Sequence, residues 1–416
     1  MNRTDIAQIS GCLTQRRKGR KGRRKTGNGG RLCETEHRSG GAAERLPAFL
    51  TVSPFLRFSD AQTVSSLPSL LLALLFLTAG LLASPCDAQT FKKEYKMTVN
   101  VGPNYYWGMG AAKFAELVSE KTNGRIVIKP YYGSALLKGA QLKSPQMVAK
   151  GVIDCAYEST INCSPVIPEM NVFSLPFFIN TFENLDRLET GQTGKALFEA
   201  MGKKGLTALA WAENGFRQLT NSRKSIRMPE DLAGLRIRIV GSPIFVDTFR
   251  QLGADPVNMN WGDAQTAFQQ GVVDGQENPA GILLPVQIWQ YHRYATFWNY
   301  LVDPVIIYWG KREWDRFPPD IQQAIRGAAV ESARFEKALC RAGLDGDVSL
   351  NILKTEFGHT PDIPDPVKHM ENKGVAVTFL SAEALKAFQA ATRPVYETWV
   401  PKIGRAIYEK ARADMK

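Results

Sequence analysis

Histidine and cysteine are scarce in this 416-residue chain, which has 4 histidines and 6 cysteines. No Cys-x-x-Cys, His-x-x-x-His or Glu-bearing zinc motif occurs, so nothing in the sequence supports a metal centre. A phosphate-binding loop, a nucleophile elbow and a dinucleotide fingerprint are also missing, because Gly108-Met-Gly110 lacks the third glycine. We therefore expect no metal and no cofactor, and a binding role is favoured over an enzymatic one.

Charged residues are missing from residues 61–86, and residues 69–82 within this gap form an apolar run. An apolar core of about 14 residues is shorter than the roughly 20 that a membrane-spanning helix needs. It is typical of a secretory signal peptide, and small residues precede a cut after Ala88. A lipidated Cys86 is a weaker alternative, because a proline precedes it. We expect export to the periplasm, with the mature chain starting near Gln89.

Positive charge is concentrated at the start of the chain. Residues 1–88 hold 13 Lys and Arg against 6 Asp and Glu, out of totals of 52 and 40. Residues 16–25 read RRKGRKGRRK, and a segment of this composition cannot bury enough apolar surface to fold. A nucleic-acid arm is one hypothesis. Because a signal peptide follows, we favour sequence upstream of the true translation start. We expect residues 1–88 to be a disordered basic leader plus signal peptide that is removed, with no nucleic acid as partner.

Three cysteines remain after that cut, namely Cys155, Cys163 and Cys340. A disulfide between the first two is compatible with an oxidising compartment. Buried free thiols are an equal alternative, and the sequence does not decide between them.

Several segments of the mature chain predict α/β units. Residues 96–101 and 125–132 have strand patterns, and residues 108–121 between them have an apolar helix face. Residues 144–154 and 264–274, which are 120 residues apart, each predict a short helix ended by glycine and a strand that begins at the following valine. Such a repeat favours two lobes of similar construction.

Later segments complete this prediction. Residues 235–240 predict a strand, and Ser242 is expected to begin a helix behind it, as Ser144 does in the first lobe. Residues 320–341 predict a long helix, residues 346–374 a looser stretch, and residues 381–410 a helix interrupted near two prolines.

The fold class we predict is α/β, a two-lobe periplasmic-binding-protein fold. Each lobe is expected to be a mainly parallel sheet flanked by helices, with a long connecting helix. The expected boundaries are residues 89–214 with about 302–343 for lobe I, and residues 215–301 with about 344–416 for lobe II.

Three side chains suggest an anion site. Arg217 lies between strand-like segments, Arg238 lies on the polar face of its strand, and Asn278 follows a strand that we expect to end in polar residues. Ligands of open α/β sheets bind beyond the carboxyl ends of strands, and the arginine fork matches a carboxylate. Trp261 is a candidate apolar wall. Periodicity alone does not choose Arg238 over Arg236.

Three motifs carry a family resemblance, and they read GLRIRI at residues 234–239, GADPVNM at 253–259 and GVVDGQENP at 271–279. With them the chain resembles the DctP-type substrate-binding proteins of tripartite ATP-independent periplasmic (TRAP) transporters, over about residues 95–411. The resemblance implies six ligand-binding residues: Arg238, Asn278, Arg217, Trp261, Glu158 and Asn100.

Departures from the sialic-acid-binding branch of the family accompany the resemblance. Ile161 stands where that branch has a further pocket arginine, which argues against sialic acid. Three aromatic residues at 105–107 crowd the first strand–helix loop and are expected to shrink the pocket. The Pro-rich segment 345–372 resembles an expansion without an assigned role.

The resemblance implies a solute-binding protein that captures a small organic acid by an arginine–carboxylate contact. Its partners would be the small and large integral membrane subunits of a TRAP transporter. Glu158 would favour a hydroxylated acid, such as a sugar acid or hydroxy acid, while a plain dicarboxylate or keto acid stays open. Alternatives are the binding component of an ATP-driven importer, and an enzyme acting on a carboxylate with Glu158 as its acid or base.

Overall fold

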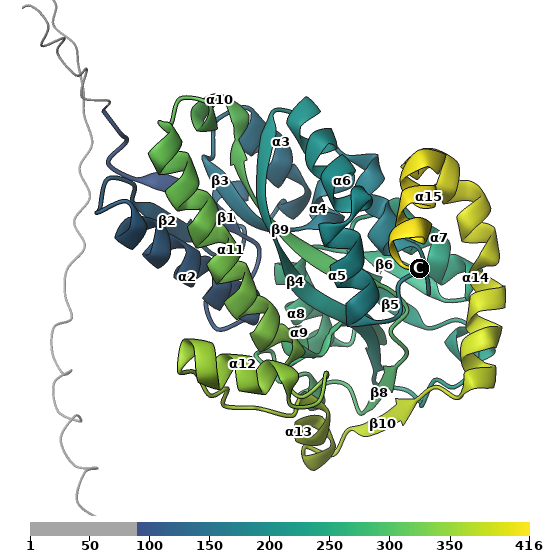
Figure 1. Cartoon of the computed structure of the whole chain (residues 1–416). Coiled ribbons are helices and arrows are strands. Elements are labelled where there is room, and N and C mark those ends of the chain that lie inside the picture. Colours follow the sequence, from purple (N-terminus) through teal and green to yellow (C-terminus); the bar gives the residue numbers. More distant parts are fainter. Residues whose placement is uncertain (1–89) are drawn as a thin grey trace, which may run out of the picture. The chain divides into compact units, whose positions relative to one another are not determined.

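A computed structural model of the protein describes residues 90–416 (Figure 1). The predictions for residues 1–88, a basic leader and a signal peptide, lie outside the described residues. In residues 90–416, the helices are too short or too polar for any of them to cross a membrane.

Ten strands are hydrogen-bonded into one sheet within the described residues. Their bounds are β1 (Tyr95–Val99), β2 (Ile128–Tyr131), β3 (Cys155–Ser159), β4 (Leu206–Asn221), β5 (Arg236–Ile239), β6 (Asp255–Asn258), β7 (Gly275–Pro279), β8 (Tyr294–Phe297), β9 (Val302–Gly310) and β10 (Ala376–Phe379). The order is β2-β1-β3-β9-β4-β7-β5-β6, and β8 pairs with β4 and β10.

The long strand β4 divides this sheet into two halves. Its first part, from Leu206 to Phe216, pairs with β9, and its last part, from Arg217 to Asn221, pairs with β7 and β8. A bulge lies near the end of the first part, at Gly215, whose φ of 107° favours glycine. On one side β1 pairs in parallel with β2 and β3, and on the other β5 pairs in parallel with β6 and β7. We call these the first and second half-sheets, and they correspond to the two expected lobes.

Helices cover both half-sheets (Figure 1). The α-helices are α2 (Tyr106–Lys121), α3 (Ser144–Ala149), α4 (Thr160–Cys163), α5 (Phe182–Thr190), α6 (Gln192–Lys203), α7 (Pro243–Gln251), α8 (Trp261–Gln270), α9 (Ala280–Leu283), α10 (Lys311–Trp314), α11 (Pro319–Arg341), α12 (Val348–Phe357), α13 (Pro366–Asn372), α14 (Ala382–Ile403) and α15 (Arg405–Asp414). Short 3₁₀ turns are η1 (Ala135–Leu137), η2 (Gln141–Lys143), η3 (Pro168–Ser174), η4 (Pro229–Leu232) and η5 (Ile288–Gln290).

Most predicted elements are confirmed. Strand β1, helix α2 and strand β2 form the expected parallel unit, and α11 is the expected long helix. It packs against α2 and β4, and therefore braces the first half-sheet close to the bulge. The three cysteines of the described chain are free and buried, so the predicted alternative of unpaired thiols holds.

The two repeated segments begin their strands later than predicted. Val152 and Val272 are exposed at 56% and 44%, and they lie in turns that follow a glycine of positive φ. Strands β3 and β7 begin three residues further on, because the turn places an aspartate against the neighbouring strand. Ser144 does not cap α3 either, since its hydroxyl lies 2.9 Å from the hydroxyl of Tyr308.

The C-terminal third also differs from the prediction. The stretch expected to be loose contains α12 and α13, because apolar residues of α12 pack on α11 through the buried Leu353. Helix α14 continues through Pro394 and Pro401, and the interruption lies at Gly404, whose φ is 96°. The prolines therefore cost hydrogen bonds without ending the helix.

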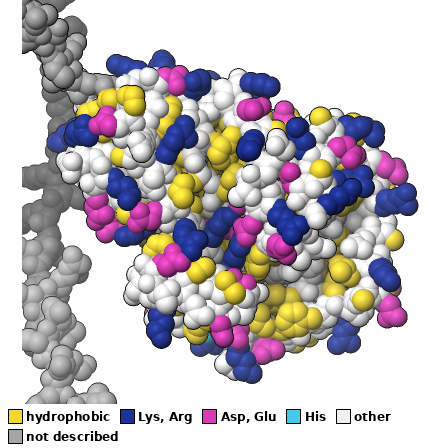
Figure 2. Space-filling model, in the orientation of Figure 1, with side chains coloured by type: hydrophobic (Ala, Val, Ile, Leu, Met, Phe, Trp, Pro, Cys, Tyr) yellow, Lys and Arg dark blue, Asp and Glu magenta, His cyan; other side chains and the backbone are white. Residues whose placement is uncertain are grey.

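Figure 2 shows Lys and Arg side chains interspersed with Asp and Glu over one face of the described part. This face carries no patch of a single sign of the kind that a nucleic-acid-binding surface presents.

Candidate functional site

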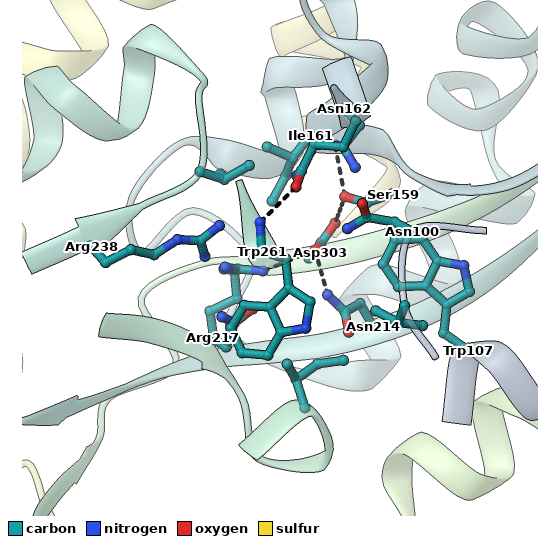
Figure 3. A pocket seen from close by; sticks show the side chains of 15 residues that line it. Asn100, Trp107, Ser159, Ile161, Asn162, Asn214, Arg217, Arg238, Trp261 and Asp303 are labelled. Carbon is teal, nitrogen blue, oxygen red and sulfur yellow. Dashed lines mark hydrogen bonds and ion pairs between the residues drawn. The ribbon is translucent and has the colours of Figure 1, made fainter. Parts of the chain in front are cut away.

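A small cavity lies where the carboxyl ends of the parallel strands of both half-sheets meet (Figure 3). Its free space is about 30 Å³, and its lining residues are Asn100, Val101, Trp107, Gln141, Ser159, Ile161, Asn162, Asn214, Arg217, Arg238, Val240, Trp261, Asn278, Ile282 and Asp303. Two residues that follow β1 and the last residue of β3 line it from the first half-sheet, and β5 and β7 supply Arg238 and Asn278 from the second. This position matches the general rule for ligands of open α/β sheets. The structure therefore brings together five of the six predicted site residues.

Arg238 is the cation of this cavity. Its side chain is 2% exposed, and its guanidinium points toward the middle of the cavity in Figure 3. Its Nε and Nη2 donate to the carbonyl of Met259 at 3.0 and 2.6 Å, and its Cζ lies 5.5 Å from the ring centre of Trp261. Within residues 90–416 no carboxylate forms an ion pair with it.

Burial lowers the pKa of Arg238 to about 10, and the charge of Glu277 acts in the opposite direction. The guanidinium therefore stays protonated at neutral pH. A buried cation without an ionic partner is costly, so this geometry favours an anion in the cavity. Arg236, the neighbour that periodicity could not exclude, pairs instead with Asp274 on the outer side of the second half-sheet.

Arg217 lies within β4, not between strands, and its charge is already balanced. Its Nε and Nη2 donate to the carboxylate of Glu277 at 2.5 and 2.8 Å, and its Nη1 donates to Asp303 at 3.0 Å. A further bond from Nη2 reaches the carbonyl of Glu277 at 2.8 Å. Burial alone would lower the pKa of Arg217, but these two carboxylates raise it. Arg217 thus forms buried structural ion pairs with Glu277 and Asp303, and its side chain also contributes to the cavity wall.

Asp303 lines the cavity and forms hydrogen bonds to residues of β3 and of both parts of β4. Its carboxylate accepts from the hydroxyl of Ser159 at 2.5 Å and from the amide of Asn214 at 2.7 Å, besides Arg217. Burial raises its pKa, and the charge of Arg217 lowers it in part. Because hydrogen bonds hold all of these groups in place, the part of the cavity wall around Asp303 is rigid.

Glu158 is the predicted site residue that does not line the cavity. It is fully buried behind the wall, where its Oε1 accepts from the backbone N–H of Ser159 at 3.0 Å and from the amide of Asn162 at 2.7 Å. Its Oε2 has no partner among the described residues, and burial raises its pKa to about 8. The structure therefore gives Glu158 the task of orienting Asn162, which does line the cavity.

The remaining predicted residues lie on the wall. Asn100 accepts from the hydroxyl of Ser134 at 2.6 Å, and Asn278 donates to Gln276 at 2.8 Å. Trp261 begins α8 and is 6% exposed, so it forms the predicted apolar wall beside Arg238.

Gln141 was missed by sequence reasoning and closes the cavity. Its Oε1 accepts from the backbone N–H of Trp261 at 3.0 Å, and its Nε2 donates to Asn162 at 2.9 Å. The first bond joins η2 to α8, and so it links the two halves across the cavity. A neighbouring cavity of about 310 Å³ lies beyond it, lined in part by Tyr105 and Asp263.

Ser159, Asn162, Asn214 and Asp303 were missed as well. The 120-residue repeat aligns residues 158–162 with 278–282, so it could have pointed to Ser159 and Asn162. Asn214 and Asp303 lie outside the repeat, and we find no sequence signal for them.

Comparison with known proteins gives the family. The sequence model of bacterial extracellular solute-binding protein, family 7, matches residues 97–347. The chain belongs to this family. Its members are solute-binding transport proteins and not enzymes, which also removes the enzymatic alternative.

The chain is similar to several proteins over most of its length. It is 29% identical over 340 residues to a C4-dicarboxylate-binding periplasmic protein of Rhodobacter capsulatus, which covers 80% of this chain and 94% of the relative. A TRAP periplasmic solute-binding protein of Ralstonia eutropha with bound (S)-2-acetolactate is 41% identical, with a TM-score of 0.73 over 78% of this chain and 99% of that one. Another from Sulfitobacter, with bound β-D-galacturonate, is 25% identical, with a TM-score of 0.67 over 77% and 99%. These structures share the two-lobe fold.

Proposed function

We propose that this family member captures a small organic acid in the cavity and that Arg238 binds the carboxylate. The observation that carries the proposal is a protonated guanidinium, buried between two half-sheets, whose partner in the described chain is a backbone carbonyl. A carboxylate at this position would supply the missing charge and two charge-assisted hydrogen bonds. Each such bond is worth roughly 1.5–3 kcal/mol.

Neighbouring residues have distinct roles in this proposal. Asn278 would hold the acid beside Arg238, Trp261 would cover its apolar side, and Asn100 would contact a polar group at the other end. Arg217 and Glu158 would act by keeping the wall in place, through the ion pairs and hydrogen bonds described above.

The ligands named for the relatives support an organic acid as the ligand of this chain, but they leave open how many carboxylates it carries. The named ligands include a monocarboxylate, a sugar acid and C4-dicarboxylates, and all of these carry a carboxylate. Closure of the two lobes over the acid would exclude water, as hinge motion does in other binding proteins. The lobe boundaries given above remain part of the proposal.

Delivery of the acid to the small and large membrane subunits of a TRAP transporter, after export by a signal peptide, completes the proposal. The family supports this partner class and a periplasmic location. The binding component of an ATP-driven importer is the alternative, and the membrane protein that co-purifies with this chain distinguishes the two.

A matched pair of arginine variants tests the proposal. Protein expressed from the full chain is screened by thermal unfolding against small carboxylic acids, and binding is then measured by calorimetry. An acid at about a hundredfold excess over its dissociation constant should stabilise the protein by about 2.7 kcal/mol. Arg238→Ala should weaken binding by about 2–5 kcal/mol, because a buried charge pair loses one member.

The control is Arg236→Ala, which removes an arginine from the same strand but from its outer side. It should bind the acid as the parent does. Equal affinities of the parent and Arg238→Ala would overturn the proposal. Unfolding without ligand checks that both variants fold.

A further inference from the structure

The charges around the cavity cancel before any ligand binds. The lining includes two arginines, Arg217 and Arg238, and one carboxylate, Asp303, while Glu277 lies directly behind Arg217. All four side chains are at most 3% exposed. Two positive charges therefore face two negative charges in a space from which water is largely excluded.

These charges are unevenly distributed within the cavity. Four hydrogen bonds engage four of the five N–H groups of Arg217 with Glu277 and Asp303. One N–H is left on Nη1, which is too few for a two-bond clamp on a second carboxylate. Arg217, Glu277 and Asp303 together carry one excess negative charge. Arg238 is consequently the one lining cation of the described residues that is not neutralised.

The rest of the lining is uncharged and combines apolar with polar side chains. On the first half-sheet side it offers amides and hydroxyls, from Asn100, Gln141, Ser159, Asn162 and Asn214. Amide groups both donate and accept hydrogen bonds, so they suit hydroxyl and keto oxygens. A second carboxylate placed there would be desolvated without a cation to pair with it.

We infer that the site selects acids with a single carboxylate, namely small hydroxy- or keto-monocarboxylates, and discriminates against dicarboxylates. This inference rests on the proposed function of Arg238 and names the substrate class. Its origin is the ion pair that removes Arg217 from ligand binding.

Isosteric acids test the inference directly. 2-Hydroxy-2-methyl-3-oxobutanoate and 2-hydroxy-2-methylmalonate differ in that a methyl ketone replaces a carboxylate of the same shape. 2,5-Dioxohexanoate and 2-oxoglutarate form a second pair of the same kind. Calorimetry on protein expressed from the full chain should give a dissociation constant about a hundredfold or more higher for the dicarboxylate of each pair that binds.

Variants of the neutralising carboxylates should shift this preference. Asp303→Asn removes one negative charge and should lower the ratio of the two dissociation constants by about tenfold. Glu277→Gln is the second variant, in case the first does not fold. Asp362→Asn, an exposed aspartate between α12 and α13, is the control and should leave the ratio unchanged.

The outcomes separate this inference from the proposed function. A dicarboxylate that binds as tightly as its monocarboxylate, with binding lost in Arg238→Ala, overturns the charge inference and leaves the function of Arg238 standing. Absence of binding by every acid of the screen overturns both. An unchanged ratio in folded Asp303→Asn and Glu277→Gln also contradicts the inference, because the two carboxylates would then not cause the selectivity.

Discussion

Residues 151–162 of the first lobe and 271–282 of the second follow one backbone plan. Each begins with a glycine of positive φ, and each then places an aspartate against the beginning of a neighbouring strand. Asp154 accepts from the backbone N–H of Lys96 at 2.7 Å, and Asp274 accepts from that of Arg236 at 3.0 Å. The two lobes therefore build the strand ends of the cavity by the same local interactions.

The chemistry at these strand ends is different. The strand registers pair Thr98 with Ala156 in the first half-sheet and Arg238 with Gln276 in the second. Since Ala156 and Gln276 are equivalent in the repeat, a threonine stands in one lobe where the other has its free cation. The two lobes therefore share the backbone geometry of these strand ends but not the charge of their side chains. One lobe can hold the carboxylate, and the other can contact the neutral part of the acid.

The largest expected effect concerns Glu158, which the repeat aligns with Asn278. Burial raises the pKa of Glu158 from 4.5 to about 8. Between these two values the folded protein keeps a proton that the unfolded chain loses, so the free energy of unfolding falls as pH rises. One group contributes up to about 1.4 kcal/mol per pH unit. Glu158→Gln should remove this slope, because an amide does not titrate.

Urea unfolding of the parent and Glu158→Gln at several pH values between 5 and 8 measures the difference. Glu189 and Glu336 also have pKa values raised by burial, but they are present in both proteins and cancel. The stability of the variant relative to the parent should increase with pH. Parallel curves would show that Glu158 is ionised in the folded protein.

A smaller effect is expected at Gly281, which the repeat aligns with Ile161. A Cβ atom at Gly281 would lie 2.1 Å from Cε2 of Tyr106, a residue of α2 in the other lobe. Overpacking of this kind costs about 1–3 kcal/mol. Because the contact joins the lobes, Gly281→Ala should weaken acid binding by opposing closure.

Removal of the clashing ring provides the control. Tyr106→Ala combined with Gly281→Ala should bind the acid better than Gly281→Ala alone, as a double-mutant cycle measures. If Gly281→Ala binds like the parent and the cycle shows no coupling, the two lobes do not press on each other at this point.

Sequence reasoning predicted the fold well because its signals are local. Glycine at helix ends, strand periodicity and the 120-residue repeat are properties of short segments, and they located β1, α2, β5 and α11. Element boundaries at residues 152 and 272 were wrong, since the turn there depends on a hydrogen bond to another strand. The helix interruption predicted near Pro394 and Pro401 was also wrong, because tertiary packing outweighed the lost hydrogen bonds.

The cavity was predicted in part for the same reason. Arg238 and Asn278 lie in motifs and Trp261 closely follows one, and the structure places all three on the wall. Sequence could not show that Arg217 is neutralised, because Asp303 is 86 residues away in the chain. Likewise, the position of Glu158 behind the wall depends on how deeply β3 is buried, which periodicity does not give.

The smallest effect is expected at Gln141, which bonds to the first residue of α8 in the second lobe. Gln141→Ala removes the neutral hydrogen bond to the backbone of Trp261 across the cavity, worth about 1 kcal/mol, and also the bond to Asn162 on its own side. Binding should weaken about fivefold, mainly through faster dissociation of the acid. Lys143→Ala, an exposed residue of the same turn, is the control and should dissociate like the parent. Because Gln141 is uncharged, its loss should leave the preference for one carboxylate unchanged, whereas a changed preference would place charge selection in the first lobe as well.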